Sequence, residues 1–219
     1  MKKILNALAV FIAIAITLPA MAQPAGMGKN DPDAKKILDA VSAKFKSYKA
    51  VQSKFTLKIE NNQNKVIGNK AGTVYMKGTK YRVTANGQEI YCDGATVWTL
   101  DNAAKEVTVS KLDLSNNTIT PQKLFTNFYD KDFLYKLNSD KGGIQEIELT
   151  PIDKNKAFFK VILYISSATK SITSAKVFEK AGNRITYSVS ALNGNATVAD
   201  AMFVYDAKQH PGVDVVDLR

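Results

Sequence analysis

The chain has 219 residues, a formal net charge of +10 and a single cysteine. One cysteine excludes an intramolecular disulfide, so the fold depends on packing alone, and Cys92, in an alternating apolar stretch, is expected to be buried and inert. The lysines are scattered rather than clustered, which favours a solvated basic surface over a nucleic-acid-binding site. Anionic membrane surfaces and acidic partners stay open as alternatives, although no polybasic run indicates them.

The N-terminus has the pattern of a secretory signal peptide. Lys2 and Lys3 precede an apolar run over residues 7–16, and a small-x-small motif ends at Ala22. The run is shorter than the roughly 20 residues that a membrane span needs, and nothing later approaches that length. We therefore expect a signal peptide over residues 1–22, cleaved after Ala22, and an exported single domain over residues 23–219. No cysteine follows the cleavage site to carry a lipid anchor.

The first predicted elements are a helix and a pair of strands. An Asp-Pro-Asp sequence at residues 31–33 is a helix start, and one apolar stripe follows at helical spacing. The stripe, more often core than a ligand surface, consists of Ile37, Leu38, Val41, Phe45 and Tyr48. Residues 51–60 alternate as a strand, and residues 65–77 return as its partner, with Gly68 and Gly72 marking bulges or bends.

Residues 72–111 predict an antiparallel meander. Asn86-Gly87 and Asp93-Gly94 separate short alternating runs, and such pairs favour tight hairpins because both turn positions need positive φ. The side chains assigned to one apolar face are Val74, Met76, Tyr81, Val83, Ile90, Cys92, Val107 and Val109. Whether a permanent core or a movable lid covers that face stays open at this point.

A helical insertion and a second set of strands follow. Thr120-Pro121 is a helix cap, and two short helices are predicted from the spacing of Leu124, Phe125, Phe128, then Phe133, Leu134 and Leu137. Further strands are predicted over residues 144–150, 157–165, 172–179, 184–192 and 201–205. Their inward candidates are Phe159, Val161, Leu163, Ile165, Ile185, Tyr187 and Val189. A sheet of about eleven strands must curl or close.

Side chains that support catalysis are sparse. The one histidine, His210, lies in a His-Pro-Gly turn far in sequence from Cys92, and the chain has no glycine-rich phosphate loop or paired-histidine spacing. The carboxylates lie mainly in turns and connections, where capping is their usual role. We expect neither an enzyme nor a protein that needs a metal or cofactor.

Several segments together resemble the LolA-like periplasmic carriers of outer-membrane lipoproteins. They are the opening helix followed by VQSKF at residues 51–55, GTVYMK at 72–77, YCDGATVW at 91–98, LTP at 149–151 and the run 203–217 with PGV at 211–213. The resemblance implies a mainly β (α+β) fold: one antiparallel, incompletely closed half-barrel of about eleven strands, with helices covering its concave apolar face.

The resemblance also implies a function. Members of the family take acylated lipoproteins from an inner-membrane ABC release complex, shield the acyl chains across the periplasm and pass them to an outer-membrane receptor. The sheet residues implied to bind lipid are Val74, Met76, Tyr81, Val83, Ile90, Val97, Phe159, Val161, Leu163, Ile185 and Tyr187. The lid implied to close over them consists of Leu124, Phe125, Phe128, Phe133 and Leu134. A monomer that binds no nucleic acid is expected.

One position departs from the family pattern. Where well-known carriers have an arginine that hydrogen-bonds to the lid, this chain has Gly78-Thr79, and Arg82 is the candidate replacement. The main alternative function is a lipid-responsive periplasmic regulator on the same scaffold. An enzyme acting on lipid or glycan is disfavoured by the missing catalytic cluster. An outer-membrane receptor is disfavoured because no lipidated N-terminal cysteine is present.

Overall fold

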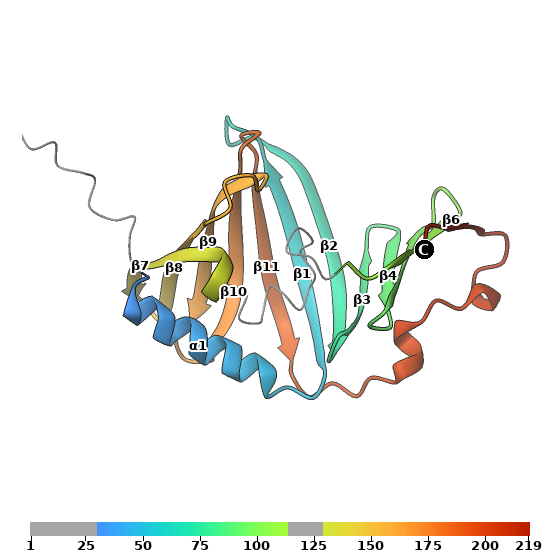
Figure 1. Cartoon of the computed structure of the whole chain (residues 1–219), viewed down its shortest axis with the longest axis horizontal. Coiled ribbons are helices and arrows are strands. Elements are labelled where there is room, and N and C mark those ends of the chain that lie inside the picture. The colour runs from blue at the N-terminus through green and yellow to red at the C-terminus, as the bar shows by residue number, and fades with distance from the viewer. Residues whose placement is uncertain (1–29, 114–128) are drawn as a thin grey trace, which may run out of the picture.

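The fold is one open sheet of twelve strands, in a computed structural model that describes residues 30–113 and 129–219. The strands are β1 (Val51–Glu60), β2 (Val66–Lys77), β3 (Lys80–Ala85), β4 (Gln88–Cys92), β5 (Thr96–Asp101), β6 (Glu106–Lys111), β7 (Phe133–Lys141), β8 (Ile144–Pro151), β9 (Phe158–Ser166), β10 (Ser171–Glu179), β11 (Arg184–Asn193) and β12 (Asp214–Asp217). Their spatial order is β12-β6-β5-β4-β3-β2-β1-β11-β10-β9-β8-β7. Only the β12–β6 pair is parallel, and the sheet curves between its two edges (Figure 1).

The predicted mainly β architecture is confirmed. Two of the observed strands, β7 and β12, were not predicted, and one predicted strand is not a strand in the structure. Residues 133–137, predicted as helical, begin β7, because pairing with β8 overrides an apolar spacing that also suits a helix turn. The short C-terminal strand β12 was missed, and the strand predicted at residues 201–205 is instead the 3-10 helix η1 (Asp200–Phe203).

The two predicted hairpin pairs form different turns. Asn86 and Gly87, with φ of 47° and 81°, are the two residues between β3 and β4, as predicted. Asp93-Gly94 instead belongs to a three-residue connection, residues 93–95, before β5. There the Asp93 side chain accepts hydrogen bonds from the backbone N–H groups of Ala95 and Thr96, both at 2.8 Å. The aspartate is therefore an Asx-type turn residue.

Helix α1 (Pro32–Lys46) begins at a residue that also binds the edge of the sheet. Asp31 Oδ1 accepts from the N–H groups of Asp33 and Ala34 at 2.9 and 3.3 Å, which caps the helix. Asp31 Oδ2 accepts from Leu137 N at 3.0 Å, and Asp31 N donates to Tyr135 O at 3.1 Å. These bonds satisfy backbone groups of the edge strand β7 that would otherwise be free to pair with another chain.

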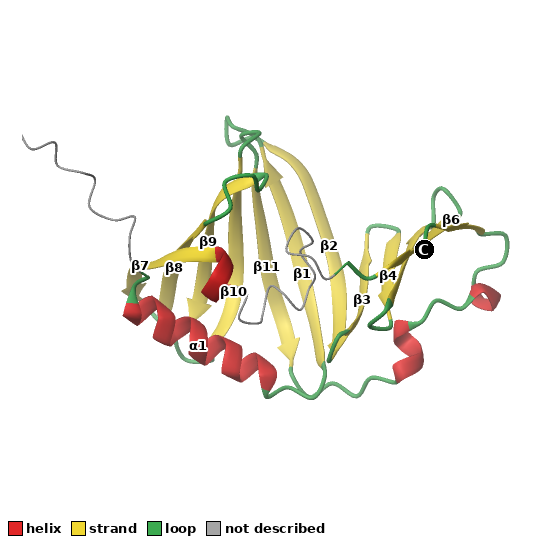
Figure 2. Ribbon diagram, in the orientation of Figure 1, coloured by secondary structure: helices red, strands yellow, loops and turns green. Residues whose placement is uncertain are grey.

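The apolar stripe of α1 packs on one side of the sheet, at the ends of β7 to β10 (Figure 2). Leu38 and Val41 are 2% and 5% exposed there. Tyr48 lies beyond the helix end, in edge contact with Phe45 at 6.0 Å. The cluster around the helix contains Ala34, Leu38, Val41, Tyr129, Phe133, Tyr135, Ile147, Leu149, Val161, Leu163, Ile165 and Ile172. We call this side of the sheet the α1 face.

The C-terminal segment packs on the opposite face, over β2 to β4. Phe203 is fully buried in a cluster with Val198 and Tyr75, and Tyr205 contacts the Tyr91 ring at 5.9 Å. Asp200 joins this segment to the β2–β3 turn, because its two oxygens accept from Lys77 and Lys80. Both of these ion pairs are solvent-exposed, so packing of the apolar residues holds the segment in place more than they do.

The opposite face also contains Val107 and Val109, which were predicted on the same face as Val74 and Met76. Ile90 pairs with Thr99 of β5, and Thr99 pairs with Thr108 of β6, so Thr108 is on the α1 face. Its neighbours Val107 and Val109 therefore point to the opposite face. They are 0% and 4% exposed. This part of the sheet is apolar on both faces. Alternation shows which side chains of one strand share a side, but not which side of the neighbouring strand lies on the same face of the sheet.

We predict that Asp31→Ala lowers the free energy of unfolding by about 1 to 3 kcal/mol, because it removes the helix cap and the bond to the β7 edge together. Asp31→Asn should cost less, since an amide oxygen still caps the helix. Asp33→Asn, which loses only a charge near the helix N-terminus, is the control. Urea unfolding monitored by circular dichroism measures all three, and an Asp31→Ala variant as stable as Asp33→Asn would contradict the prediction.

We also predict that the stability difference between these variants depends on pH. Hydrogen bonds from the backbone of Leu137, and then of Asp33 and Ala34, hold the pKa of Asp31 below its ordinary value in spite of partial desolvation. A depressed carboxyl pKa adds stability that is complete above the unfolded pKa of about 4 and is lost as pH falls through the folded pKa. The stability difference between the wild type and Asp31→Asn should therefore shrink in acid below that pH.

Candidate functional site

The strand register aligns the side chains of the α1 face in rows across the sheet. Going from the β8–β9 end of the strands towards the other end, the rows are Val161–Val177–Ile185–Ile59–Gly68, Leu163–Ala175–Tyr187–Leu57–Lys70, Val189–Phe55–Gly72–Ala85–Gln88, Ser53–Val74–Val83–Ile90–Thr99 and Val51–Met76–Tyr81–Cys92–Val97. Of these residues only Lys70 carries a charge. The α1 face is therefore almost wholly apolar over its central strands.

Ten of the eleven sheet residues implied to bind lipid share this face. They are Val74, Met76, Tyr81, Val83, Ile90, Val97, Val161, Leu163, Ile185 and Tyr187. Residues from six strands and from distant parts of the chain thus lie on one surface. Their role in lipid binding stays a prediction.

Phe159 is the exception, and a β-bulge explains it. Phe178 pairs with Lys160, whereas the next residue, Glu179, pairs with Phe158, so Phe159 is one extra residue in β9. Phe158 consequently packs into the α1-face cluster and stacks on Phe133 at 6.1 Å. Phe159 is 49% exposed and contacts Phe178 on the opposite face at 6.2 Å. The inward assignment of Phe159 was wrong, because one inserted residue reverses the alternation.

The predicted lid is only partly within the described residues. Leu124, Phe125 and Phe128 lie outside them. Phe133 and Leu134 belong to β7 rather than to a helix; Phe133 is buried in the α1-face cluster and Leu134 points to the other side of the strand.

The helix α2 (Tyr129–Asp132) precedes β7 and was not predicted. Tyr129 is 2% exposed, and its hydroxyl donates to Asp39 of α1 at 2.9 Å. The Tyr129 ring also contacts Tyr135 of β7 edge-on at 5.9 Å. This tyrosine therefore joins α1 to the first turn before β7, a role that its sequence context did not signal.

The α1 face has a filled part and a more open part. Beneath α1, Leu163 and Ile165 are 3% and 0% exposed. Val51, Val74, Met76, Tyr81 and Cys92 are buried in a second cluster with Phe45 and Tyr48. Between and beside these two clusters the inward apolar side chains are half-buried, and we call this area the open part of the α1 face. It consists of Phe55, Leu57, Ile59, Val83, Ile90, Val97, Val177, Ile185, Tyr187 and Val189. A hydrocarbon chain placed on these side chains would remove further apolar surface from water.

Glycines in β2 shape the middle of this area. Gly68 and Gly72 occupy inward positions opposite Ile59 and Phe55. A Cβ atom at Gly72 would lie 2.6 Å from Phe55 Cζ and 2.3 Å from the Thr84 carbonyl oxygen, so the Phe55 ring lies directly over this glycine. The register shifts between Ile59 and Glu60, which leaves Ile67 of β2 as an extra residue next to Gly68 and fits the irregularity predicted at Gly68, whereas the β1–β2 register does not shift at Gly72.

The side chains of Tyr81, Cys92 and Tyr187 on the α1 face are held neutral. Burial, together with the nearby charge of Glu179, raises the pKa of Tyr187, and burial raises the pKa values of Tyr81 and Cys92. A fully buried thiol with a raised pKa is a poor nucleophile. Within residues 30–113 and 129–219 no group of three metal-ligating side chains occurs. The chemistry that this face offers is apolar contact.

Arg82, the candidate for the family's lid arginine, points to the opposite face. Its Nη2 atom lies 2.6 Å from Glu89 Oε2 and 3.2 Å from Tyr91 Oη, and the guanidinium stacks over the Tyr91 ring at 4.7 Å. Partial burial opposes ionisation of Glu89, but the bonds from Arg82 and Tyr91 outweigh it and lower the pKa. Arg82 therefore does not replace the latch on the α1 face.

A separate groove of about 420 Å³ lies between α1 and the nearby ends of β7, β8 and β9. Ile37, Leu137 and Ile165 contribute apolar walls, whereas Lys36 and Asp140 are among its charged residues. Mixed charges make this groove less suited to a hydrocarbon than the open part of the α1 face.

The open curved sheet is a half-barrel, and the family comparison agrees with this fold. The family described as "Outer membrane lipoprotein carrier protein LolA" matches residues 46–206. This chain belongs to the LolA family. A search of curated proteins found no match. Among the part of the chain that the structure describes, no helix is long and apolar enough to cross a bilayer.

Solved structures share the fold at low sequence identity. An uncharacterized conserved protein from Thermus thermophilus is 14% identical with a TM-score of 0.56, covering 84% of this chain and 99% of its own. Lipoprotein LppX from Mycobacterium tuberculosis is 12% identical with a TM-score of 0.49, covering 78% and 100%. A LolA superfamily protein from Nitrosomonas europaea is 15% identical with a TM-score of 0.45, covering 80% and 98%.

We predict that Gly72→Ala destabilises the protein by about 2 kcal/mol or more, because the new methyl group meets both the Phe55 ring and a backbone oxygen that cannot turn away. Gly68→Ala is the matched control in the same strand. Its Cβ would be 3.3 Å from the flexible end of Ile59, which can shift. Equal losses in urea unfolding for the two variants would contradict this description of the β1–β2 contact.

Proposed function

We propose that this protein binds the acyl chains of lipoproteins on the open part of the α1 face and carries them through the periplasm to the outer membrane. The observation that carries the proposal is the half-buried apolar surface across β1, β3, β4, β5, β10 and β11, on a chain of the LolA family. The signal-peptide pattern ending at Ala22 supports export.

The energetics fit a reversible carrier. Each CH₂ group of an acyl chain moved out of water is worth about 0.8 kcal/mol, so a free lipid anchor needs a cover during transit. The open part of the α1 face is already partly exposed, and covering it with a guest gains further apolar contact. The buried cluster beneath α1 keeps the sheet folded whether or not a guest is bound. Binding of an acyl chain therefore need not change the structure of the sheet.

Binding accounts for the features of this face better than catalysis does. Cys92 is fully buried, and His210 stacks on Tyr205 at 5.0 Å in the C-terminal segment. Tyr205 in turn contacts Tyr91, so His210 lies on the opposite face of the sheet from Leu57 and Tyr187. We propose a non-enzymatic monomer that receives lipoproteins from an inner-membrane ABC complex and delivers them to an outer-membrane receptor.

Leu57→Glu tests the binding surface, because it places a carboxylate in the middle of the open part of the α1 face. We expect it to weaken binding of a fluorescent fatty acid at least tenfold, since a charge facing hydrocarbon is strongly disfavoured. Thr56→Glu is the matched control: it puts the same charge on the neighbouring residue, which is exposed on the other face. Fluorescence titration compares the two variants with the wild type.

A second substitution separates lost binding from lost folding. Leu57→Asn has nearly the shape of leucine and should weaken binding without unfolding the sheet. Thermal unfolding of each variant is measured alongside the titration. Unchanged affinity in folded Leu57→Glu and Leu57→Asn proteins would refute the assignment of this surface.

Depletion of the protein in cells tests the carrier role. We expect acylated lipoproteins to accumulate in the inner-membrane fraction, and mass spectrometry of the purified protein to detect bound acylated protein or lipid. Normal delivery of lipoproteins to the outer membrane would contradict the proposal. Normal delivery together with altered envelope-stress signalling would instead identify a lipid-responsive regulator.

A further inference from the structure

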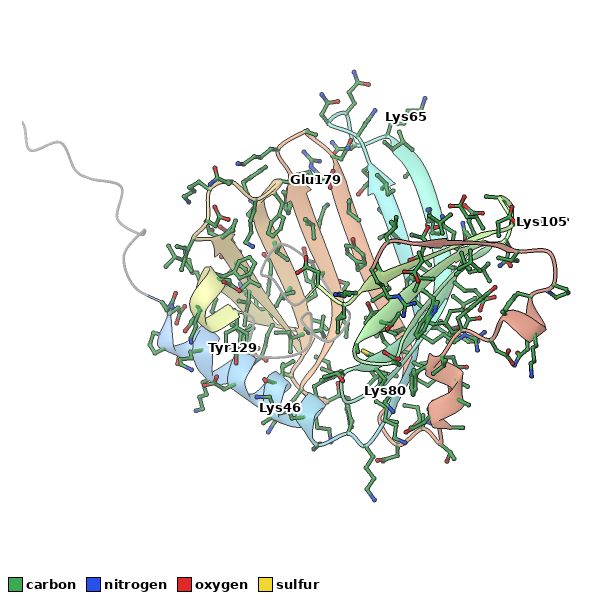
Figure 3. The ribbon with its side chains drawn as sticks, turned by 45° about the vertical axis from the view of Figure 1, so that its right-hand side comes forward. Lys46, Lys65, Lys80, Lys105, Tyr129 and Glu179 are labelled. Atoms are coloured by element: carbon green, nitrogen blue, oxygen red, sulfur yellow. The ribbon has the colours of Figure 1, made fainter. Side chains whose placement is uncertain are left out.

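Three connections meet at one end of the sheet, far from Lys80, which begins β3 at the other end. They join β1 to β2, β8 to β9 and β10 to β11, and we call residues 58–67, 152–160 and 176–184 the hairpin rim. Lys180 N donates to Ala157 O at 2.8 Å, and a Cβ on Gly182 would lie 3.3 Å from Asn62 Cβ. The β1–β2 and β10–β11 turns lie together at the top of Figure 1, and Lys65 and Glu179 lie at this end in Figure 3.

Large apolar side chains are exposed on two of the three segments of this rim, residues 58–67 and 152–160. Val66 and Ile67 are 50% and 57% exposed, Ile152 is 51% exposed, and Phe159 is 49% exposed. The bulge in β9 is what turns Phe159 outward. Half-exposed apolar side chains that share one end of a molecule are typical of an interaction surface.

The same rim is strongly basic. Its three segments contain eight lysines and arginines and three carboxylates, so they hold +5 of the chain's net charge of +10. Lys160, Lys176 and Arg184 surround the Phe178 ring at 4.7, 5.7 and 5.9 Å. Within the described residues no ion pair joins these three cations to a carboxylate, whereas Lys58 pairs with Glu60 at 3.2 Å.

We infer that the hairpin rim docks on the surface of an anionic lipid bilayer. Apolar tips such as Phe159 and Ile152 would enter the boundary between headgroups and acyl chains, while the lysine and arginine side chains reach the phosphates. The cations supply charge complementarity to that surface. The apolar residues come from separate segments, the start of β2, the β8–β9 connection and the start of β9, instead of lining one groove. This arrangement suits a fluid surface better than the fixed shape of an acidic protein.

The rim borders the open part of the α1 face, so docking there would bring a bilayer close to the proposed acyl-binding surface. Ile59, which belongs to the rim, pairs with Ile185, which directly follows the rim residue Arg184, and both are part of the open part of the α1 face. An acyl chain could therefore move between a docked bilayer and the open part of the α1 face over a short path through little water. This use rests on the proposed acyl binding, whereas the docking itself does not.

Co-sedimentation of the protein with vesicles tests the inference. The vesicles are phosphatidylcholine alone or mixed with phosphatidylglycerol. We expect binding to the mixed vesicles only, weakened by salt, and weakened roughly a hundredfold or more in the triple variant Lys65→Glu, Lys154→Glu, Lys180→Glu. The control triple variant, Lys111→Glu, Lys141→Glu, Lys208→Glu, changes three exposed lysines elsewhere and has the same net charge. The affinity of this control variant for the mixed vesicles should fall several-fold less than that of the rim variant.

A second pair of variants tests the apolar tips. Ile152→Ser with Phe159→Ser should weaken vesicle binding several-fold more than Val204→Ser with Val215→Ser, which are 44% and 58% exposed but lie outside the rim. Phe159→Trp in a Trp98→Phe background places the only tryptophan at the rim. Brominated lipids should quench its fluorescence on binding and leave that of wild-type Trp98 unchanged.

Three outcomes would overturn the inference: no binding to anionic vesicles, equal losses in the rim and control triple variants, or no quenching of the rim tryptophan. Binding of polyglutamate that depends on the rim lysines, without vesicle binding, would identify the rim as a protein-docking site instead. The fatty-acid titration distinguishes the two proposals. Lost vesicle binding with intact fatty-acid binding overturns only the docking, and the reverse result overturns only acyl binding.

Discussion

Helix α1 is too short to cover a twelve-stranded sheet, and the packing of the described residues follows from this mismatch. The 15 residues of α1 span about 22 Å at 1.5 Å per residue. Twelve strands about 4.8 Å apart are roughly 50 Å across. The helix therefore buries inward residues such as Leu163 and Ile165 of β9 and leaves others, such as Leu57 of β1 and Tyr187 of β11, half-buried. A fold stabilised at one end of its face can offer the other part of that face to a ligand.

The two faces of the sheet are covered by different parts of the chain, and this keeps their functions separate. The C-terminal segment packs Phe203 and Tyr205 on the face opposite α1, where Arg82 is also bound by Glu89 and Tyr91. A guest on the α1 face therefore does not compete with these contacts. The basic hairpin rim lies at the end of the strands, beyond both clusters. The proposed acyl binding and the proposed membrane docking can thus be tested with separate sets of variants.

Much of the fold could be predicted from the sequence because its signals are local. Alternation in β1, the Asn86-Gly87 turn and the Asp-Pro-Asp helix start each depend on a few neighbouring residues. The failures share another cause. Phe159 was placed inward because a single inserted residue leaves no mark in the composition of β9, and Val107 was placed on the wrong face because its phase depends on pairing with β5.

The sequence by itself determined most of the strands and, except at the β9 bulge, which side chains share a side within each of them, since that follows from the two-residue period of extended backbone. Only the tertiary structure decided which of those sides became the α1 face and how much of it α1 covers. It alone assembled the hairpin rim as well, because Lys65, Lys154 and Lys180 are far apart in the chain and meet only when β1, β9, β10 and β11 pair. Pairing between distant strands fixes such surfaces, and no single stretch of residues records it.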